Sequence, residues 1–438
     1  MNYQQTLDYL FARLPMFSRI GAAAYKADLD NTIRLCESLD NPQHKFKTIH
    51  IAGTNGKGST SHMLAAILHT AGYKTGLYTS PHLKDFRERI KINGGPNGYR
   101  EVNKDFVIDF TEKIAPLIDK IEPSFFEITV AMAFEYFAKE KVDIAVIETG
   151  LGGRLDSTNI ITPELSIITN IGWDHMNILG DSLEKIAWEK AGIIKDGIPV
   201  VIGETTEETK VVFEKMATEK NAPLVIASQK RQVLDWYWEK QEMVVEVAEV
   251  HHTDHQKYHL DLPGSYQRKN LLIVLEACSQ LRQKGWKIDD KIIHTGLQHT
   301  KQITGLHGRW EMIRHSPAVV LDVAHNVDGI GQLVQQAELT AHTQLHIVIG
   351  MVKDKDIERV LALLPKTAVY YFTKAQIPRA LPEDELMEKA GKLGLKGDAF
   401  PEVNKAIRFA LQHAHPDDLV LVCGSVFLVG EVNNSQFI

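Results

Sequence analysis

The stretch Lys47-Thr-Ile-His-Ile-Ala-Gly-Thr-Asn-Gly-Lys-Gly-Ser-Thr60 decides the fold of the chain around it. Its first half alternates apolar residues, including Ile49 and Ile51, as a half-buried strand does. A glycine-rich turn with Lys57 follows, and residues 59–68 have the pattern of a helix. A strand, a glycine turn and a helix N-terminus together form a phosphate cradle, because backbone N–H groups point inward and the helix dipole favours an anion.

The turn also carries the side chains that phosphate binding needs. Lys57 supplies a positive charge, and Ser59 or Thr60 supplies a hydroxyl group for Mg²⁺. The spacing departs from the common P-loop pattern, since Gly53 lies three residues before Gly56 and glycine follows the lysine. An ordinary glycine-rich turn is the competing interpretation. We expect the phosphates of a nucleoside triphosphate to contact Gly53, Thr54, Asn55, Gly56, Lys57, Gly58 and Ser59.

Composition limits the class of protein. A chain of 438 residues with 44% hydrophobic and 24% charged residues is ordinary globular material of roughly two to three domains. A formal net charge of −7 argues against a nucleic-acid partner. We expect no membrane span or signal peptide, because no apolar run approaches about 20 residues. Three widely spaced cysteines, Cys36, Cys278 and Cys423, indicate buried thiols in a reducing cytoplasm.

Strand and helix patterns alternate along most of the chain. Buried strands are predicted at residues 75–79, 143–148, 166–169 and 198–202, and helices at 106–120, 125–139 and 183–191. Alternation of this kind predicts an α/β fold, with a doubly wound, mostly parallel sheet and ligands at the carboxyl ends of its strands. Residues 242–248 and 258–262 indicate an antiparallel ribbon, and a helix is predicted at 267–282.

A second, smaller α/β unit of Rossmann-like type is predicted to begin near residues 305–309. Its strands are expected at residues 318–323, 345–350, 369–372 and 419–423. We therefore divide the chain into a nucleotide-binding domain, residues 1–302, and a C-terminal domain, residues 303–438. Two α/β domains with a cleft between them would suit a reaction of two substrates.

Several polar residues follow the predicted strands. Glu148 ends a buried strand and is placed either to hold Mg²⁺ or to cap the next turn. Asp174 and His175 follow the next strand, where His175 is either a ligand or a structural residue. Lys185 and Lys190 lie near the end of a predicted helix, a position that by itself only favours cations.

Other polar groups lie further along the chain. In the second unit, Asp322, His325 and Asn326 leave a strand, and ligand contacts and a solvated loop are equally good interpretations. The densest group of histidines, at residues 251, 252 and 255, falls in a polar turn and is expected to be exposed.

Eight segments, in this order, resemble the folylpolyglutamate synthase family, whose bacterial members often also act as dihydrofolate synthases. The matching segments span nearly the whole chain and contain, in order, Gly-Thr-Asn-Gly-Lys-Gly-Ser, Thr-Ser-Pro-His-Leu, Glu-Thr-Gly-Leu-Gly-Gly-Arg-Leu-Asp, Asp-His, Glu-Lys-Ala-Gly-Ile, His-Gly-Arg-Trp, Asp-Val-Ala-His-Asn and Cys-Gly-Ser-Val-Phe-Leu-Val-Gly-Glu. The Gly-Lys-Gly-Ser form of the phosphate turn separates this family from the related Mur peptidoglycan ligases. The resemblance implies a Mur-ligase-like central domain and a glutamate-ligase-like C-terminal domain.

The resemblance also assigns roles to residues. It implies Mg²⁺ ligands at Ser59, Ser80, Glu148 and His175, with two Mg²⁺ ions and K⁺ allowed as a further cation. It implies a carbamylated lysine at Lys190, and Lys57, Lys190 and His175 as catalytic residues. ATP contacts are implied at Asn270, Arg309, Asp322 and His325. The sequence departs from the family pattern at two positions. Tyr266, near Asn270, stands where a histidine is common, and Trp173 stands where a smaller side chain is common.

The implied reaction is ATP-dependent formation of an amide with L-glutamate. The acceptor carboxylate, of dihydropteroate, a reduced folate or both, attacks the γ-phosphate of ATP, and the glutamate amine then attacks the acyl phosphate. The substrates are thus small molecules, and we expect a cytoplasmic monomer without a nucleic-acid or membrane partner. Two alternatives remain: a Mur-type ligase acting on a UDP-muramyl substrate, and a nucleotide-dependent switch without chemistry.

Overall fold

Strand β1 (Lys47–Ala52) lies inside an eight-stranded sheet, between β5 (Ile144–Glu148) and β6 (Leu165–Ile168). The computed structural model describes residues 1–16, 21, 26, 28–95, 98–252 and 254–437. The strand order is β4-β3-β2-β5-β1-β6-β7-β8, and every neighbouring pair from β2 to β8 is parallel. The remaining strands of this sheet are β2 (Thr75–Tyr78), β3 (Ile90–Gly95), β4 (Gly98–Glu101), β7 (Val200–Ile202) and β8 (Leu224–Ile226).

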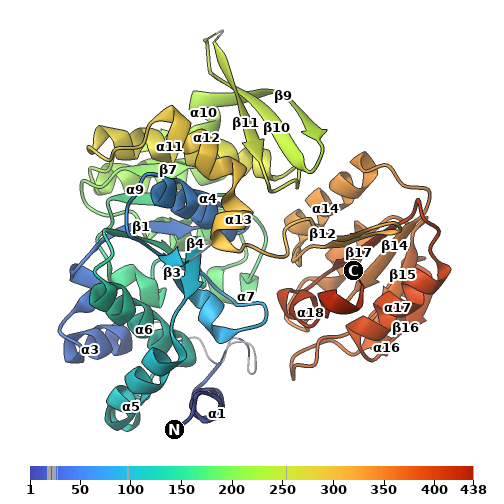
Figure 1. Ribbon diagram of the computed structural model, residues 1–438, viewed down its shortest axis with the longest axis horizontal. Helices are drawn as coiled ribbons and strands as arrows, with labels where there is room; N and C mark the ends of the chain where they lie inside the picture. Colours follow the sequence, from blue (N-terminus) through green and yellow to red (C-terminus); the bar gives the residue numbers. More distant parts are fainter. Residues whose placement is uncertain (17–20, 22–25, 27, 96–97, 253, 438) are drawn as a thin grey trace. The chain divides into compact units, whose positions relative to one another are not determined.

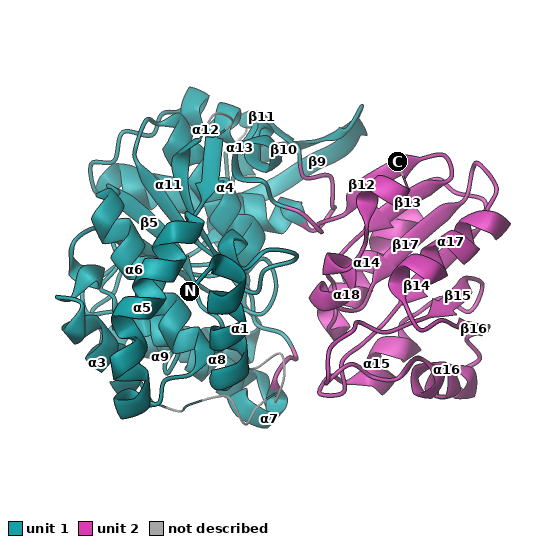
Figure 2. Cartoon of the chain, turned by 60° about the horizontal axis from the view of Figure 1, so that its bottom comes forward, with its two compact units in different colours: residues 1–172, 176–261, 267–306 teal, residues 173–175, 262–266, 307–438 magenta. Residues whose placement is uncertain are grey.

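The chain divides into two units, coloured teal and magenta in Figure 2. Unit 1 comprises residues 1–172, 176–261 and 267–306, and unit 2 comprises residues 173–175, 262–266 and 307–438. The main division falls between Leu306 and His307, whereas the sequence analysis puts the domain boundary between residues 302 and 303. Two short segments, 173–175 and 262–266, belong to unit 2 although the chain on both sides of them belongs to unit 1.

Helices cover both faces of the large sheet, as a buried parallel sheet requires. Figure 1 shows α4, α11 and α12 on one side of the sheet and α3, α5 and α6 on the other. Ser124 caps α6 with a capping box, in which the Ser124 hydroxyl accepts from the Glu127 N–H and the Glu127 carboxylate accepts from the Ser124 N–H. The helices of unit 1 are α1 (Tyr3–Arg13), α3 (Asp30–Ser38), α4 (Lys57–Thr70), α5 (Lys104–Ile121), α6 (Phe125–Glu140), α7 (Met176–Leu179), α8 (Leu183–Ala191), α9 (Glu207–Glu219), α10 (Ala227–Lys230), α11 (Gln267–Gln283), α12 (Asp290–Gln298) and α13 (Thr300–Thr304).

Two parts of unit 1 differ from the sequence analysis. Strands β3 and β4 add an antiparallel edge to the sheet, and no strand was expected there. The ribbon has three strands, β9 (Arg231–Glu239), β10 (Glu242–Glu249) and β11 (His255–Leu260), where two were expected. Strand β9 has no buried residue, so it lacks the apolar alternation by which a half-buried strand is recognised.

Unit 2 contains a six-stranded sheet in the order β12-β13-β17-β14-β15-β16, with β12 antiparallel at its edge. Its apolar core is separate from that of unit 1 and includes Ile347, Tyr370 and Leu421 from three neighbouring strands. The fold class is confirmed: a mostly parallel α/β sheet precedes a smaller α/β unit. Its elements are β12 (Glu311–His315), β13 (Ala318–Leu321), α14 (Val327–Leu339), β14 (Leu345–Ile349), α15 (Ile357–Ala362), β15 (Val369–Phe372), α16 (Glu383–Lys392), β16 (Gly397–Ala399), α17 (Val403–His413), β17 (Leu419–Cys423) and α18 (Val426–Gly430).

Candidate active site

The glycine turn joins the carboxyl end of β1 to the N-terminus of α4. Gly53 has φ +148°, and a Cβ atom there would lie 1.9 Å from Thr169 Oγ1. Gly56 has φ +84°, and a Cβ atom there would lie 2.3 Å from Asn270 Oδ1. Gly56 is also the N-cap of α4, and no side chain caps that helix end. The turn is therefore closely packed against Thr169 and Asn270, and the helix begins without a side-chain cap from its N-cap residue.

Lys57 lies folded over this turn. Its ammonium group donates to the carbonyl oxygens of Gly53, at 3.0 Å, and Thr54, at 3.3 Å. Neither carbonyl is part of a charged group, so an incoming phosphate would be the stronger partner for the ammonium. The Lys57 ammonium group thus lies at the glycine turn itself.

The residues that follow β6 hold the turn in place. Thr169 Oγ1 donates to the Asn55 carbonyl at 2.6 Å, and Asn170 Oδ1 accepts from the Asn55 N–H at 2.8 Å. On the other side, the Thr54 hydroxyl bonds with the N–H and carbonyl of Gly172. These contacts place the exit of β6 directly beside the exit of β1, as their parallel pairing requires.

Helix α11 supplies a second support. The fully buried Gln267 donates through Nε2 to Ser59 Oγ at 3.1 Å, and its Oε1 accepts from Asn270 Nδ2 at 2.7 Å. Asn270 in turn packs against Gly56. The structure therefore brings Asn270 to the glycine turn, and the sequence analysis did not identify Gln267, which orients both Asn270 and Ser59.

Glu148, Ser80 and Lys190 also meet at this end of the sheet. Glu148 is 4% exposed, ends β5 opposite Ile51, and accepts from the Ser80 N–H at 3.2 Å. Lys190 is 4% exposed, and its ammonium group donates to the Gly53 carbonyl at 2.9 Å. Lys190 thus lies in the last turn of α8, as expected, with its ammonium group on the glycine turn. Lys185 instead lies in the first turn of α8, is exposed and pairs with Asp181 at 2.6 Å.

These groups fit a magnesium ion. A buried carboxylate, the Ser59 hydroxyl and the Ser80 hydroxyl are hard oxygen donors, and Mg²⁺ usually takes one or two carboxylates together with phosphate oxygens and water. The Thr60 hydroxyl of the same turn is buried and has no hydrogen-bond partner among the described residues. Among the described residues, no three His, Cys, Asp or Glu side chains form a group that could hold a metal ion.

A second cluster of polar residues lies in unit 2 around Asp174. Its carboxylate pairs with Lys355 Nζ at 2.5 Å and with His325 Nε2 at 3.5 Å, and it accepts from Asn326 Nδ2 at 3.2 Å. Lys355 Nζ also lies 3.3 Å from His175 Nε2. Burial alone would raise the pKa of Asp174, but the Lys355 ammonium and the His325 hydrogen bond hold it well below its usual range.

The segment after β13 forms another group in unit 2. Asp322 is 3% exposed and accepts from the Tyr266 hydroxyl at 2.6 Å, the Trp310 N–H at 2.8 Å and the Ala324 N–H at 2.9 Å. Burial raises the pKa of Asp322, and these donors together with Arg309 oppose that shift. The Asp322 carboxylate thus links the segments next to Arg309 and His325 by hydrogen bonds. Tyr266, which replaces a common histidine, is one of its donors.

The structure distributes the predicted site residues over both units. Lys57, Ser59, Ser80, Glu148, Lys190 and Asn270 belong to unit 1, and His175, Arg309, Asp322 and His325 belong to unit 2. Their roles in binding ATP and Mg²⁺ stay predictions. The residues that the sequence analysis missed are Gln267, Thr169, Asn170 and Lys355. Thr169 and Asn170 follow a recognisable strand, but no sequence signal pointed to Lys355.

Three further expectations concern the histidine group, membrane spans and the cysteines. His251, His252 and His255 are exposed, as expected from the polar turn. No helix among the described residues is long and apolar enough to cross a membrane. The three cysteines are buried and free.

The chain is similar to known proteins along almost its whole length. Residues 51–278 match the Mur ligase middle domain, and residues 308–426 match the Mur ligase glutamate ligase domain. The dihydrofolate synthase/folylpolyglutamate synthase of Bacillus subtilis is 32% identical over 441 residues, covering 98% of each chain.

Solved structures agree with these matches. FolC of E. coli, in complex with DHPP and ADP, is 30% identical with a TM-score of 0.84, covering 100% of this chain and 98% of that one. Folylpolyglutamate synthase of Mycobacterium tuberculosis, complexed with ADP, is 28% identical with a TM-score of 0.86, covering 98% of this chain and 96% of that one.

Proposed function

The chain belongs to the folylpolyglutamate synthase and dihydrofolate synthase family of the Mur ligases, which are ATP-dependent ligases, and we propose that it joins L-glutamate to dihydropteroate, to reduced folates or to both. The observation that carries the proposal is that Lys57 and Lys190 both donate to the Gly53 carbonyl of the glycine turn, while the buried Glu148 ends the neighbouring strand β5. A nucleotide switch has no need of Glu148 and Lys190. The ADP bound in FolC of E. coli supports nucleotide binding, and its DHPP supports a small-molecule acceptor.

The reaction forms one amide bond at the expense of ATP. The acceptor carboxylate attacks the γ-phosphorus atom, ADP leaves, and an acyl phosphate results. The amine of L-glutamate then attacks the acyl carbon, loses a proton, and inorganic phosphate leaves. No side chain needs to form a covalent bond with substrate, so catalysis depends on position and charge.

This chain's residues would act mainly on the transferring phosphoryl group. The Lys57 ammonium would move from the Gly53 and Thr54 carbonyls onto the phosphate oxygens, and the N–H groups at the start of α4 would bind the same charge. Arg309 of unit 2 would stabilise the same developing charge. Asp322 would act through position, because its carboxylate is already bonded to Tyr266, Trp310 and Ala324.

Ser59, Ser80, Glu148 and His175 would hold Mg²⁺, which neutralises charge on the phosphates when bound. Lys190 would contribute as a carbamate, since a lysine amine that captures CO₂ becomes an anionic oxygen donor. The buried position of this amine, beside the Gly53 carbonyl, supports a role at the cradle rather than at the surface. We also propose a cytoplasmic monomer, which suits three buried free thiols.

The test is phosphate release from ATP with Mg²⁺ and L-glutamate, with dihydropteroate and tetrahydrofolate compared as acceptors. Release with both acceptors would establish the two activities in one enzyme, and release with one would identify the single activity. Release only with a UDP-muramyl substrate would overturn the proposed acceptor in favour of a peptidoglycan precursor.

A further inference from the structure

Tyr266 is bonded to a predicted site residue and has no predicted role of its own. Its hydroxyl lies 2.6 Å from Asp322 Oδ2, and a Cβ atom on Gly264 would lie 2.7 Å from its ring carbon Cζ. The ring is therefore held against the backbone of its own segment. Burial and the neighbouring Asp322 carboxylate raise the pKa of Tyr266 well above its usual range, so the hydroxyl keeps its proton and stays a donor.

Asp322 connects this hydroxyl to the turn that carries Arg309. The same oxygen, Oδ2, accepts from the Trp310 N–H at 2.8 Å, and Trp310 is the residue after Arg309. A second carboxylate, that of Glu311, accepts from the Gly308 N–H at 2.8 Å. The backbone on each side of Arg309 is thus bonded to a buried carboxylate.

Trp310 needs this support, because its backbone is left-handed, at φ +47°. A tryptophan in that region is a backbone outlier, and such strain persists only where the surroundings hold it. The Trp310 side chain is 4% exposed in the core of unit 2, and the Asp322 carboxylate holds its N–H. Arg309 is therefore presented by a backbone conformation that depends on these contacts.

The Arg309 side chain itself has weak contacts within its turn. Its Nη1 atom donates to two uncharged carbonyl groups, that of Gly308 at 3.2 Å and that of His307 at 3.5 Å. Phosphate oxygens would be stronger partners for a guanidinium. Because these side-chain contacts are weak, the direction of the Arg309 side chain depends mainly on the backbone of the turn.

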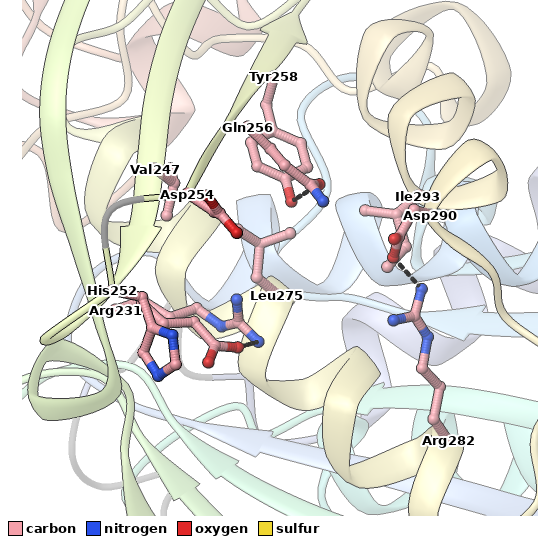
Figure 3. A pocket seen from close by; sticks show the side chains of 11 residues that line it. Arg231, Val247, His252, Asp254, Gln256, Tyr258, Leu275, Arg282, Asp290 and Ile293 are labelled. Carbon is pink, nitrogen blue, oxygen red and sulfur yellow. Dashed lines mark hydrogen bonds and ion pairs between the residues drawn. The ribbon is translucent and has the colours of Figure 1, made fainter.

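Charged pairs in unit 1 provide a contrast. The groove between the ribbon and helices α11 and α12 holds two of them, Arg282 with Asp290 at 2.5 Å and Arg231 with Glu249 at 3.4 Å (Figure 3). None of these four residues is a predicted site residue, and each pair joins opposite charges. The Tyr266 hydroxyl differs, because its acceptor is a predicted site residue.

We propose that Tyr266 is a positioning residue for Arg309. Its hydroxyl fixes the Asp322 carboxylate, which holds the Trp310 backbone and so directs the Arg309 guanidinium. The inference rests on the proposed function, in which Arg309 stabilises charge on the transferring phosphoryl group. This charge develops in the transition state, so a misdirected guanidinium lowers kcat more than it raises KM for ATP.

The test compares two Tyr→Phe variants of unit 2 in the phosphate-release assay. Tyr266→Phe should lower kcat about tenfold and change KM for ATP by less than about twofold. Tyr371→Phe is the control, because its hydroxyl bonds with His346 Nδ1 at 2.9 Å and neither is a predicted site residue. Both variants lose a hydroxyl that is bonded to a buried side chain, but only the first should lose turnover.

A double-variant cycle identifies the residue through which Tyr266 acts. Arg309→Ala should lower kcat by about 100-fold. Adding Tyr266→Phe to Arg309→Ala should lower kcat by less than about twofold further, because the side chain that Tyr266 directs is already absent. A further loss of about tenfold in this background would overturn the proposal.

Hydrogen exchange of the Trp310 N–H, followed by NMR without substrates, needs no turnover. Tyr266→Phe should speed this exchange about tenfold, and Tyr371→Phe should leave it unchanged. An unchanged exchange rate in Tyr266→Phe, or a wild-type kcat, would overturn the proposal. If the wild type itself releases no phosphate, the proposed function fails, whereas the exchange rates still decide whether Tyr266 holds the Arg309 turn.

Gly264→Ala provides a second variant if Tyr266→Phe does not fold. It keeps the hydroxyl, but its Cβ atom would displace the Tyr266 ring from its place beside Asp322. Gly264→Ala should therefore lower kcat and speed the exchange of the Trp310 N–H in the same way. Wild-type values of both in Gly264→Ala would contradict the assignment.

Discussion

Lys57 is the single side chain on which the proposed reaction depends most. Within the part of the chain that the structure describes, its ammonium group bonds to two uncharged carbonyl groups of its own turn, those of Gly53 and Thr54. These contacts contribute little to the stability of unit 1, because a partly exposed hydrogen bond contributes about 1 kcal/mol. Loss of the ammonium should therefore affect the chemistry and spare the fold.

We expect Lys57→Ala to reduce phosphate release to below about 1% of the wild-type rate, since a group that stabilises transition-state charge contributes roughly 3 kcal/mol or more. The matched control is Lys185→Ala, which removes an exposed lysine that pairs with Asp181 and should keep nearly full activity. Circular dichroism melting should be similar for both variants. A Lys57→Ala enzyme with normal turnover would refute the role of the cradle.

Gly56 has a positive φ, and the side chain of Asn270 lies close to it. Gly72 has a similar φ without such a contact. Both Gly56, at φ +84°, and Gly72, at φ +87°, have left-handed backbone, but a Cβ atom on Gly72 would meet nothing within 4 Å. Gly72 follows the far end of α4. The pair therefore separates backbone strain from the contact with Asn270.

Gly72→Ala should lower the free energy of unfolding by about 1 kcal/mol through strain alone and leave ADP affinity unchanged. Gly56→Ala should cost the same strain and also displace Asn270 Oδ1, raising the Kd for ADP by about tenfold. Titration with ADP and urea unfolding measure the two effects. Equal ADP affinity in both variants would mean that the approach of Asn270 is unimportant.

At the scale of the element, helix α13 is capped by a residue far from it in sequence. The Asp261 carboxylate accepts from the N–H groups of Lys301, at 2.7 Å, and Gln302, at 3.2 Å, in the first turn of α13. Its other oxygen, Oδ1, is buried and has no hydrogen-bond partner among the described residues. This burial raises the pKa of Asp261 to about 6.

The raised pKa makes the contribution of Asp261 depend on pH. An unfolded aspartate has a pKa of about 3.9, so the folded state binds the proton more tightly. The stabilisation is complete below a pH of about 4 and is lost as the pH rises through about 6. Asp261→Asn keeps one acceptor oxygen for α13 but cannot ionise.

We therefore expect the stability of Asp261→Asn, relative to wild type, to rise by about 2 kcal/mol between pH 4 and pH 7.5. Urea unfolding at the two pH values measures this difference. Asp289→Asn is the control, because Asp289 is an exposed cap that accepts from the Ile292 N–H at the start of α12. A relative stability of Asp261→Asn that does not change with pH would contradict the burial argument.

At the scale of the whole molecule, unit 2 incorporates short segments from the middle of the chain. Within residues 262–266, the Ser265 N–H donates to Gln336 Oε1 at 2.6 Å and the Tyr266 hydroxyl donates to Asp322 Oδ2 at 2.6 Å. These bonds join the segment to the sheet and helix of unit 2. Because the two units have separate apolar cores, we expect two unfolding transitions in calorimetry.

Tyr266→Phe should lower the unfolding temperature of unit 2, because Asp322 loses a donor while it stays buried, a change that costs about 1–3 kcal/mol. The transition of unit 1 should not move. The control, Tyr99→Phe, removes a hydroxyl that donates to the Ala65 carbonyl in unit 1 and should shift that unit's transition instead. If Tyr266→Phe unfolds like the wild type, the segment is held by other contacts.

The sequence predicted regular elements well where apolar residues recur with a clear period. The helix at residues 183–191 and the strands at 369–372 and 419–423 are confirmed with the expected bounds. The prediction failed for strand β9, none of whose residues is buried. Periodicity reports burial, so an element that is not buried gives no signal.

By itself, the sequence determined the α/β class, the phosphate turn and the family, because these depend on local patterns of apolar residues, glycines and one lysine. Only the tertiary structure decided that Thr169, which follows β6, and Gln267 of α11 support that turn. It also gave the contacts of Asn270 and Lys190, which the resemblance had assigned to the site. It also revealed Lys355 beside Asp174. The physical reason is that hydrogen bonds and charge pairs act over a few ångströms in space, and sequence spacing does not encode that distance between separate elements.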